Sequence, residues 1–347
     1  MISKIERING ILSKERIEGL LIVDSSNLFY LTGFHAPACY GLLSGSGMEL
    51  FVPPLLYSQA AGAVKGIRVT AMKDNAVFSL KACLKRAGIR RLAFEEAKLS
   101  LAMYRRMENG MGRVEMIAKD GMIEDLRVIK DENEIKLMRK SAGICMSSLE
   151  YMGKRIKTGM KEKNIAARLE YFMRQRGAEK SSFDCIVASG ENTAYPHHIP
   201  GERKVRGNDA VLIDCGCTYG GYASDLTRVI FLDKIHRYGR MRKIYDAVVR
   251  AKEKATGIIR PGIKCRDVDR IARNVIEDAG FGKYFTHGTG HGLGIDVHER
   301  PYFNSKSGEI LKPGMVCTVE PGVYIPGEGG VRLEDMILVT EKGHEVL

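Results

Sequence analysis

Tryptophan is absent from this 347-residue chain, and aromatic residues make up only 7% of it. No apolar stretch approaches the roughly 18 uninterrupted residues that a membrane-spanning helix needs. The opening residues Met1–Glu6 mix charged with apolar side chains and lack the apolar centre of a secretory signal. We therefore expect a protein that neither crosses a membrane nor is exported. Its 44% hydrophobic and 28% charged residues are typical of a folded soluble protein.

Cysteine pairs with the Cys-X-X-Cys spacing are also missing. The eight cysteines include no Cys-X-X-Cys pair, the spacing that many zinc and redox sites use. A chain of this length can bury an apolar core large enough to fold without a disulfide framework. The cysteines therefore predict reduced thiols in a cytoplasmic protein.

A concentrated basic stripe is lacking, although the net charge is +12. The excess of Lys and Arg extends over both halves of the sequence. In the densest part, Lys154–Lys163, basic residues alternate with apolar residues and a Thr-Gly pair. Nucleic-acid-binding proteins usually combine a concentrated basic surface with a recognisable motif or aromatic platforms. We therefore expect a generally basic surface and no nucleic-acid partner.

Residues 1–125 have the pattern of a small α/β domain. The apolar run Leu20–Val23 predicts a strand, and Gly45–Gly47 separates two apolar stretches as a hairpin turn does. Helical patterns lie near 54–65, 76–87 and 99–109, and a further strand pattern lies at 91–94. No cluster of reactive side chains stands out in this domain.

Residues 126–347 form the second predicted domain, which begins after a boundary near residues 118–131. Long helical patterns lie at 132–156, 162–176, 236–256 and 266–279. Strand-like runs lie between and after them at 183–188, 209–214, 222–232, 315–320 and 331–339. Helix-rich and strand-rich stretches of this kind predict an α+β domain.

Two aspartates in this second domain occupy strand patterns. Asp214 ends the apolar run that begins at Ala210, where an unpaired carboxylate would be costly and a cation partner is implied. Strand alternation directs Cys215 to the opposite face, so this thiol is expected to pack rather than to bind a ligand. Asp225 shares a strand face with Thr227, whose hydroxyl group is positioned to support the carboxylate.

A glycine-rich stretch, Thr286–Gly294, contains His287 and His291, and His298 follows shortly after it. The glycines allow the backbone to approach a ligand closely and leave the imidazoles accessible. The stretch is not a nucleotide-binding loop, because no strand-to-helix pattern surrounds it, and it does not contain the His-Glu-X-X-His spacing of many zinc peptidases.

Two glutamates complete the set of candidate ligands. Glu320 ends the strand pattern that begins at Val316, and Glu334 shares a strand face with Arg332 after the Gly327–Gly330 turn. Taken singly, each acidic residue or histidine is most simply solvated or ion-paired. Together, two Asp, two Glu and one His form an oxygen-rich ligand set suited to two divalent ions of the Mn, Co or Zn kind.

These motifs carry a family resemblance. Gly290-His291-Gly292, Glu320–Gly322 and Arg332–Asp335, together with Asn27–Phe34 in the first domain, resemble the Xaa-Pro peptidase branch of the methionine aminopeptidase/creatinase/prolidase superfamily. The resemblance extends over nearly the whole chain. It implies a creatinase-like N-terminal domain followed by a catalytic domain with the "pita-bread" fold. It also implies five metal ligands in this order: Asp214, Asp225, His291, Glu320 and Glu334.

The resemblance also suggests roles for other residues of the site. His197, His287 and His298 match active-site histidines of the family, whereas the role of the neighbouring His198 is left open. Glu320 is the candidate for proton transfer. Arg332 is expected to orient Glu334 or another carboxylate through a charge-assisted bond.

The implied activity is hydrolysis of the bond between an N-terminal residue and proline, with two divalent metal ions, of which Mn²⁺ is the expected one and Co²⁺ or Zn²⁺ the alternatives. The substrate is a peptide with proline at its second position, and the family leads us to expect a homodimer. Aminopeptidase P, which acts on longer peptides, and prolidase, which cleaves dipeptides, both fit the sequence. A metal-dependent amidohydrolase of another N-acyl compound and a non-catalytic binding protein of the same fold stay open as alternatives.

Overall fold

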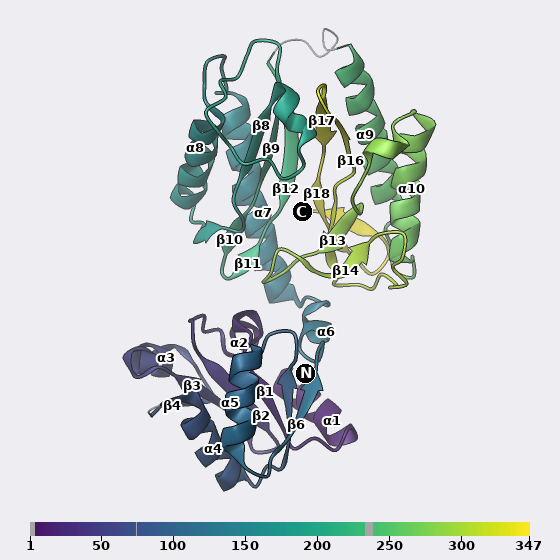
Figure 1. Ribbon diagram of the computed structural model, residues 1–347. Helices are drawn as coiled ribbons and strands as arrows, with labels where there is room; N and C mark the ends of the chain where they lie inside the picture. Colours follow the sequence, from purple (N-terminus) through teal and green to yellow (C-terminus); the bar gives the residue numbers. More distant parts are fainter. Residues whose placement is uncertain (1–3, 74, 233–238) are drawn as a thin grey trace. The chain divides into compact units, whose positions relative to one another are not determined.

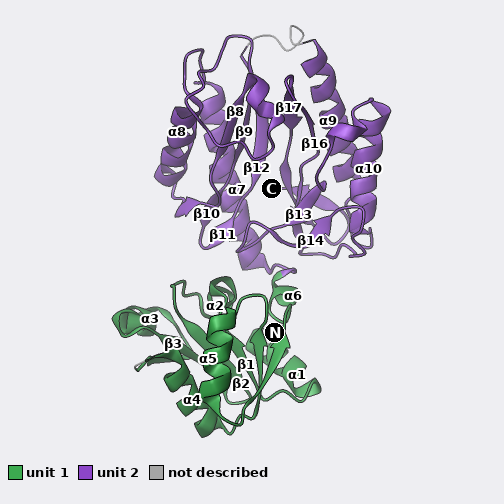
Figure 2. Ribbon diagram, in the orientation of Figure 1, with its two compact units in different colours: residues 1–127 green, residues 128–347 purple. Residues whose placement is uncertain are grey.

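The computed structural model describes residues 4–73, 75–232 and 239–347 (Figure 1). The chain divides into two compact units, one ending at Arg127 and the other comprising Val128–Leu347 (Figure 2). No helix within these ranges is both long enough and apolar enough to cross a bilayer.

The first unit is built on a mixed six-stranded sheet in the order β4-β3-β2-β1-β5-β6. The strands are β1 (Gly19–Ile22), β2 (Tyr40–Ser44), β3 (Gly47–Val52), β4 (Arg68–Ala71), β5 (Arg91–Glu95) and β6 (Glu115–Lys119). The helices are α1 (Lys4–Lys14), α2 (Ser25–Thr32), η1 (Pro54–Leu56), α3 (Tyr57–Ala63), α4 (Ala76–Ala87), α5 (Leu101–Met111) and α6 (Glu124–Arg127).

The sequence patterns of this unit correspond to real elements. The predicted hairpin is the β2–β3 pair, in which Ser44 is opposite Gly47. The core lies where α4 and α5 pack their apolar faces on the sheet, with Leu80 and Met107 fully buried. The helix predicted at 54–65 is a 3₁₀ turn followed by α3, since consecutive prolines at its start delay α-helical hydrogen bonding.

The second unit contains four long helices: α7 (Glu132–Gly153), α8 (Glu162–Gln175), α9 (Arg240–Gly257) and α10 (Cys265–Asp278). Asp131 begins α7 with a capping box, because its carboxylate accepts from the Glu134 backbone while the Glu134 side chain accepts from the Asp131 backbone. The part of the predicted helix at 236–238 lies outside the described residues.

The strands of this unit form several antiparallel layers (Figure 1). The first group is β7 (Lys180–Ser181), β8 (Ile186–Ser189), β9 (Ala210–Cys215), β10 (Cys217–Tyr219), β11 (Tyr222–Ala223) and β12 (Leu226–Phe231). The second is β13 (Gly290–Gly292), β14 (Glu299–Phe303), β15 (Val316–Val319), β16 (Gly322–Ile325), β17 (Gly329–Arg332), β18 (Asp335–Val339) and β19 (His344–Val346). Two short 3₁₀ segments are η2 (Gly190–Ala194) and η4 (Gly282–Tyr284).

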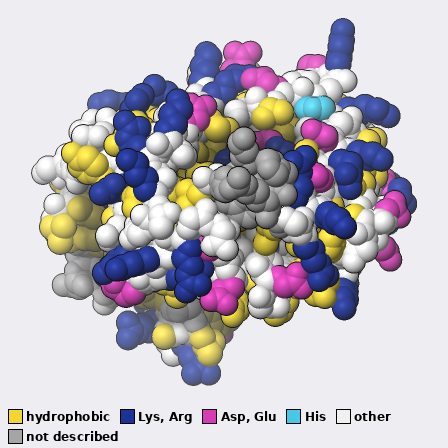
Figure 3. All heavy atoms as spheres, turned by 90° about the horizontal axis from the view of Figure 1, so that it is seen from above, with side chains coloured by type: hydrophobic (Ala, Val, Ile, Leu, Met, Phe, Trp, Pro, Cys, Tyr) yellow, Lys and Arg dark blue, Asp and Glu magenta, His cyan; other side chains and the backbone are white. Residues whose placement is uncertain are grey.

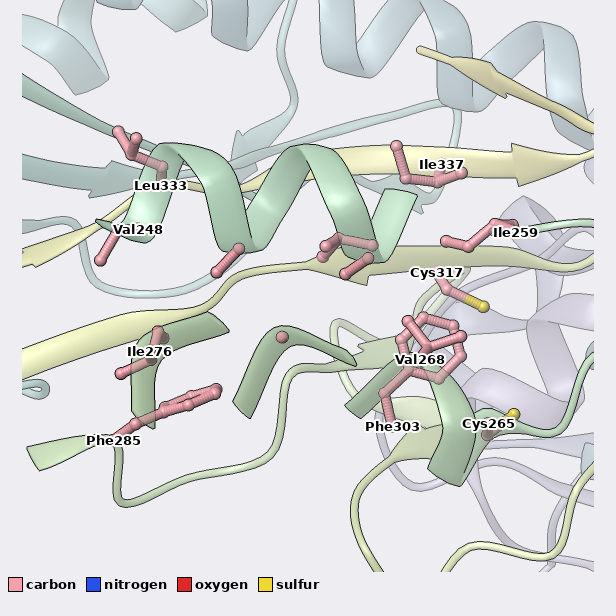
Figure 4. Packing of buried hydrophobic residues seen from close by; sticks show 14 of the residues in the cluster. Val248, Ile259, Cys265, Val268, Ile276, Phe285, Phe303, Cys317, Leu333 and Ile337 are labelled. Atoms are coloured by element: carbon pink, nitrogen blue, oxygen red, sulfur yellow. The ribbon is translucent and has the colours of Figure 1, made fainter. Parts of the chain in front are cut away.

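Helices cover the outer faces of these strands. Helices α7 and α8 pack against the β8-β9-β12 sheet, and α9 and α10 pack against the strands of the second group. Figure 4 shows the core on that second side, where Val268 and Ile276 of α10 lie among Phe303 and other fully buried side chains. Each fully buried aliphatic side chain contributes about 1.5–3 kcal/mol to folding.

Two predicted strands are broken, and both breaks occur beside acidic residues. The 222–232 pattern divides into β11 and β12 around Ser224-Asp225, where the Ser224 hydroxyl group bonds the backbone of Cys217. The 331–339 pattern divides into β17 and β18 around Leu333-Glu334. At both breaks the regular strand is interrupted, and the carboxylates of Asp225 and Glu334 line a cavity.

The cysteines pack in the interior without disulfides, and the basic side chains on the face shown in Figure 3 are spread out. All eight cysteines lie within the described residues, are buried and form no disulfide. Cys215 packs against helix α7, where its sulfur lies 3.6 Å from that of Cys145. On the face shown in Figure 3, Lys and Arg side chains are scattered among acidic and uncharged ones.

Candidate metal centre and active site

The five predicted metal ligands come from separate segments of the second unit and line one cavity of about 770 Å³. Asp214 lies on β9 and His291 on β13, whereas Asp225, Glu320 and Glu334 lie at strand ends. Strand β12 lies beside β17 and β18, which brings the two groups of strands together at this point (Figure 1). A cavity of this size is suited to a small ligand or a short peptide.

His291 has the geometry of a metal ligand with a fixed tautomer. Its Nδ1 lies 3.0 Å from the Gly292 carbonyl oxygen, which can only accept, so Nδ1 carries the proton. The Nε2 lone pair then faces Glu320 Oε1 at 3.4 Å and Asp225 Oδ2 at 3.7 Å. Burial lowers the pKa of His291 to about 4, which keeps the imidazole neutral.

Three buried carboxylate oxygens of this cavity have no hydrogen-bond partner among the described residues: Asp214 Oδ1, Asp225 Oδ1 and Glu334 Oε1. Asp225, His291 and Glu334 each offer a ligand atom, and these atoms lie within 4.8 Å of one another. Burial, together with neighbouring carboxylates, raises the pKa of both Asp225 and Glu334 well above the ordinary range. Bound cations would remove these costs, so the residues present fit a divalent metal site.

The other oxygens of two ligands are held by neighbouring side chains. Arg332 Nη2 donates to Asp214 Oδ2 at 2.6 Å, and Thr227 Oγ1 donates to Glu334 Oε2 at 2.7 Å. The carboxylate that Arg332 contacts directly is therefore Asp214. Thr227 therefore donates its hydroxyl hydrogen bond to Glu334 and not to Asp225. Its strand, β12, lies beside β17 and β18, and Glu334 lies at the break between those two strands.

Glu320 is a largely buried carboxyl group with a raised pKa. Burial raises its pKa to about 7, with the nearby Asp214 carboxylate adding to the increase and Arg332 opposing it. Thr318 Oγ1 lies 3.4 Å from Glu320 Oε1 and accepts from the His291 backbone at 3.1 Å. The carboxyl group is thereby tied to the strand that carries His291.

His287 is linked to Arg332 by hydrogen bonds through Tyr324, a residue that the sequence analysis did not single out. Its Nδ1 donates to the Gly288 carbonyl oxygen at 2.7 Å, so its Nε2 accepts from the Tyr324 hydroxyl group at 2.9 Å. The same hydroxyl oxygen accepts from Arg332 Nη1 at 2.7 Å. Burial lowers the pKa of His287 to about 4 and raises that of Tyr324 to about 12, so both groups are neutral.

His197, His198 and His298 also line the cavity. The ring centroids of His298 and His291 are 4.3 Å apart, and burial lowers the pKa of His298. The structure thus brings together all the residues that the sequence singled out. It adds Tyr324 of strand β16. Alternation along this strand places Tyr324 on the same face as Gly322, and Gly322 is paired with Arg332 of β17. The structure also adds Glu162, a fully buried partner of His198.

The glycines around His291 serve the packing of the strand rather than the approach of a ligand. A Cβ atom at Gly290 would overlap the Thr318 carbonyl oxygen, and one at Gly292 would overlap the Arg300 carbonyl oxygen. Strand β13 lies between β14 and β15, and only residues without a side chain fit at these two positions. Close packing holds His291 buried, with 7% of its surface exposed.

With this geometry established, sequence comparison identifies the family. The pattern of metallopeptidase family M24 matches residues 136–341, and that of the creatinase/prolidase N-terminal domain matches residues 4–129. The chain therefore belongs to metallopeptidase family M24. The resemblance drawn from the motifs and the predicted fold class are both confirmed.

Named relatives cover nearly the whole chain. It is 37% identical to the Xaa-Pro dipeptidase of Pyrococcus horikoshii, over 100% of this chain and 97% of that protein. The structure of an Xaa-Pro dipeptidase from Bacillus anthracis superimposes with a TM-score of 0.95 at 35% identity, covering 99% and 96% of the two chains. That of an X-Pro aminopeptidase from Thermotoga maritima does so with a TM-score of 0.92 at 32% identity, with the same coverage.

Proposed function

We propose that this protein is a metal-dependent peptidase that hydrolyses the bond between an N-terminal residue and proline. The observation that carries the proposal is the cluster of buried carboxylates with unpartnered oxygens around the neutral His291, in a cavity that four further histidines line. The names of the full-length relatives support the choice of an Xaa-Pro bond as the substrate.

Asp214, Asp225, His291, Glu320 and Glu334 would hold two divalent ions, with Mn²⁺ the expected metal and Co²⁺ or Zn²⁺ the alternatives. When bound, the ions supply Lewis-acid activation of water and of the scissile carbonyl group. Oxygen-rich ligand sets with one imidazole suit these ions, and adjacent pairs of them commonly share carboxylates.

Glu320 is the residue that we assign to proton transfer. Its carboxylate is assigned to accept a proton from the attacking water and to deliver it to the departing proline nitrogen. In an Xaa-Pro bond this nitrogen is tertiary and must be protonated before it leaves as an amine. The position of Glu320 at the cavity wall, with Oε1 3.4 Å from His291 Nε2, supports this assignment.

The histidines and Arg332 position the reacting groups. His298, beside His291 in the cavity, is assigned to hydrogen-bond the oxygen on which negative charge develops. His197 is assigned to hold the substrate, and His287 is assigned to contact it through its ring, because the Gly288 carbonyl oxygen and the Tyr324 hydroxyl group engage both ring nitrogens of His287. Arg332 fixes Asp214 and balances part of the charge of the carboxylates.

Proline selectivity has a physical basis in this cavity. The nitrogen of the scissile bond has no hydrogen to donate, so the enzyme must recognise the shape of the pyrrolidine ring. Apolar side chains along the wall, among them Phe183, Ile186 and Val297, offer a surface that a five-membered ring can contact.

The wider assignments follow from the same family. We propose that residues 1–125 form the creatinase-like domain and residues 126–347 the catalytic domain. We also propose a cytoplasmic homodimer that acts on peptides and has no nucleic-acid or membrane partner. Light scattering coupled to size-exclusion chromatography tests the dimer.

The proposed function is tested by hydrolysis of an Xaa-Pro dipeptide and of an Xaa-Pro-Yaa tripeptide after incubation with Mn²⁺. Cleavage of the tripeptide identifies an aminopeptidase, and cleavage of the dipeptide alone identifies a dipeptidase. If neither peptide is cleaved with Mn²⁺, Co²⁺ or Zn²⁺ although two ions bind, the substrate is another amide. If no metal binds, the catalytic assignment is wrong.

A matched pair of variants distinguishes a carboxylate that binds metal from an ordinary surface carboxylate. Asp225→Asn should abolish metal binding and turnover, together with the rise in melting temperature that Mn²⁺ causes in the wild-type protein. Glu328→Gln changes an exposed carboxylate that pairs with Arg240 and should leave all three unchanged. Equal metal content in the two variants would contradict the ligand assignment.

A further inference from the structure

His198 is the cavity histidine that the proposed chemistry does not use. It follows His197 in the segment Tyr195–Pro200, which reaches the cavity wall. The backbone N–H of His198 donates to the Tyr195 carbonyl oxygen at 3.2 Å, which closes a turn with Pro196 and His197 at its centre. The two adjacent histidines therefore occupy different positions in one tight turn.

The His198 side chain contacts a buried carboxylate rather than a ligand of the metal site. Its Nε2 lies 2.8 Å from Glu162 Oε2, and a carboxylate lowered in pKa can only accept, so Nε2 carries the proton. Glu162 is the first residue of α8, and its side chain is fully buried. An imidazole that points back into the protein in this way fixes the turn that carries it.

Glu162 also holds the stem of this loop. Its Oε1 accepts from the backbone N–H and the hydroxyl group of Ser189, both at 2.7 Å, and from Asn192 Nδ2 at 3.1 Å. These hydrogen bonds outweigh the effect of burial and keep the pKa of Glu162 below its usual range. One carboxylate thus anchors the end of β8, the 3₁₀ segment η2 and, through His198, the turn at the tip.

The turn is held on its other side by the metal-site arginine. Arg332 Nη1 donates to the Pro196 carbonyl oxygen at 3.3 Å while Nη2 of the same guanidinium group binds Asp214. His197 consequently lies between two fixed points, Pro196 and His198. Because Arg332 is itself tied to the cluster of carboxylates, the turn has a defined position relative to the reacting groups.

We propose that His198 is a positioning residue: its hydrogen bond to Glu162 sets the place of His197 at the cavity wall, and with it the binding of the substrate. This inference rests on the proposed Xaa-Pro peptidase function, since His197 is assigned there to hold the substrate. The stem contacts of Ser189 and Asn192 keep the loop folded without His198, so the effect of His198 is local to the turn.

The test compares His198→Ala and His198→Gln with the wild-type protein in the tripeptide and dipeptide assays. The alanine variant should lose about 10- to 100-fold in kcat/KM, because small displacements of a positioning group have effects of this size. Glutamine offers an amide N–H that can reach Glu162, so it should recover activity to within about threefold of wild type. Metal content should be unchanged in both variants.

A double-mutant cycle with His197→Ala identifies the route of the effect. If His198 acts through His197, adding His198→Ala to the His197→Ala variant should cause no further loss of kcat/KM. Multiplicative losses would overturn the proposal, since they would mean that the two histidines act independently. Loss of metal or of folding in step with activity, without rescue by glutamine, would overturn it as well.

Ser189→Ala is the matched control for the anchor. It removes a hydroxyl donor from Glu162 but leaves the bond to His198, so it should lower the melting temperature while kcat/KM stays within about threefold of wild type. A wild-type protein that cleaves neither peptide would refute the proposed function. A wild-type protein that cleaves one of them while His198→Ala is equally active would refute only the role of His198.

Discussion

The hydroxyl group of Tyr324 donates a hydrogen bond to Nε2 of His287 at 2.9 Å, and its oxygen accepts one from Arg332 at 2.7 Å. Because the same guanidinium group binds Asp214, a proposed active-site histidine and a proposed metal ligand belong to one chain of hydrogen bonds. A substitution of any residue in this chain should therefore affect both His287 and Asp214.

Tyr324→Phe should lower kcat/KM about tenfold, because His287 loses the donor that fixes its orientation and Arg332 loses an acceptor. One of the two N–H groups of the buried Arg332 Nη1 loses its acceptor while the bond to the Pro196 carbonyl oxygen stays, and this should also cost about 1–3 kcal/mol of folding free energy. Steady-state kinetics and urea denaturation measure the two effects. Tyr104→Phe removes a hydroxyl group that pairs with the exposed Glu108 in the first unit, and it should change neither quantity.

Arg332→Lys should weaken metal binding about 10- to 100-fold, although the charge is kept. A single ammonium group cannot serve Asp214, Tyr324 and the Pro196 carbonyl oxygen at once. Titration calorimetry with Mn²⁺ measures the loss. Arg240→Lys, in an exposed pair with Glu328, is the control, and equal affinities in the two variants would rule out an orienting role for Arg332.

Glu49 should make the stability of the first unit depend on pH. Burial favours its neutral form, but hydrogen bonds from Thr70 and Cys83 and the charge of Arg86 outweigh this and hold its pKa below 4.5. An acid with a lowered pKa stabilises the folded state above its unfolded pKa, and this contribution is lost as the pH falls through the folded pKa.

The measurement is urea denaturation of the wild-type protein and Glu49→Gln at a series of pH values. At pH 7 the variant should be less stable, and the difference should shrink as the pH falls below about 4.5 toward the folded pKa. A difference that stays constant over this range would show that the charge of Glu49 plays no part.

Ile276→Ala should destabilise the second unit by about 2–5 kcal/mol, since this fully buried side chain of α10 leaves a cavity in the core of Figure 4. Ile310→Ala removes the same atoms from a side chain that is 46% exposed, and it should change the unfolding free energy by less than about 0.5 kcal/mol. Similar losses in both variants would contradict the placement of this core.

Each candidate ligand has a local signal in the sequence, and the combination of these signals with the family resemblance predicted them as one set. Asp214 ends an apolar strand, Glu320 follows another, and His291 lies between two glycines. Such signals depend on neighbours within a few residues. The structure brings these side chains together as the order of the motifs led us to expect.

Partners that are distant in the sequence could not be predicted in the same way. Arg332 lies 118 positions from Asp214, and Glu162 lies 36 positions from His198. Hydrophobic periodicity says which face of an element is buried but not which polar side chain it meets. The strand breaks at Asp225 and Glu334 were missed for a related reason, since alternation continues across them while the backbone bends.

The packing of β13 has a consequence for the evolution of this enzyme. Even a methyl group at Gly290 or Gly292 would collide with the backbone of an adjoining strand. The two positions beside His291 therefore tolerate almost no substitution. The turn that carries His197 is built from side-chain anchors and is free of that constraint. Selection for new substrates, in nature or in the laboratory, should therefore accumulate changes in the turn and leave the histidine strand untouched.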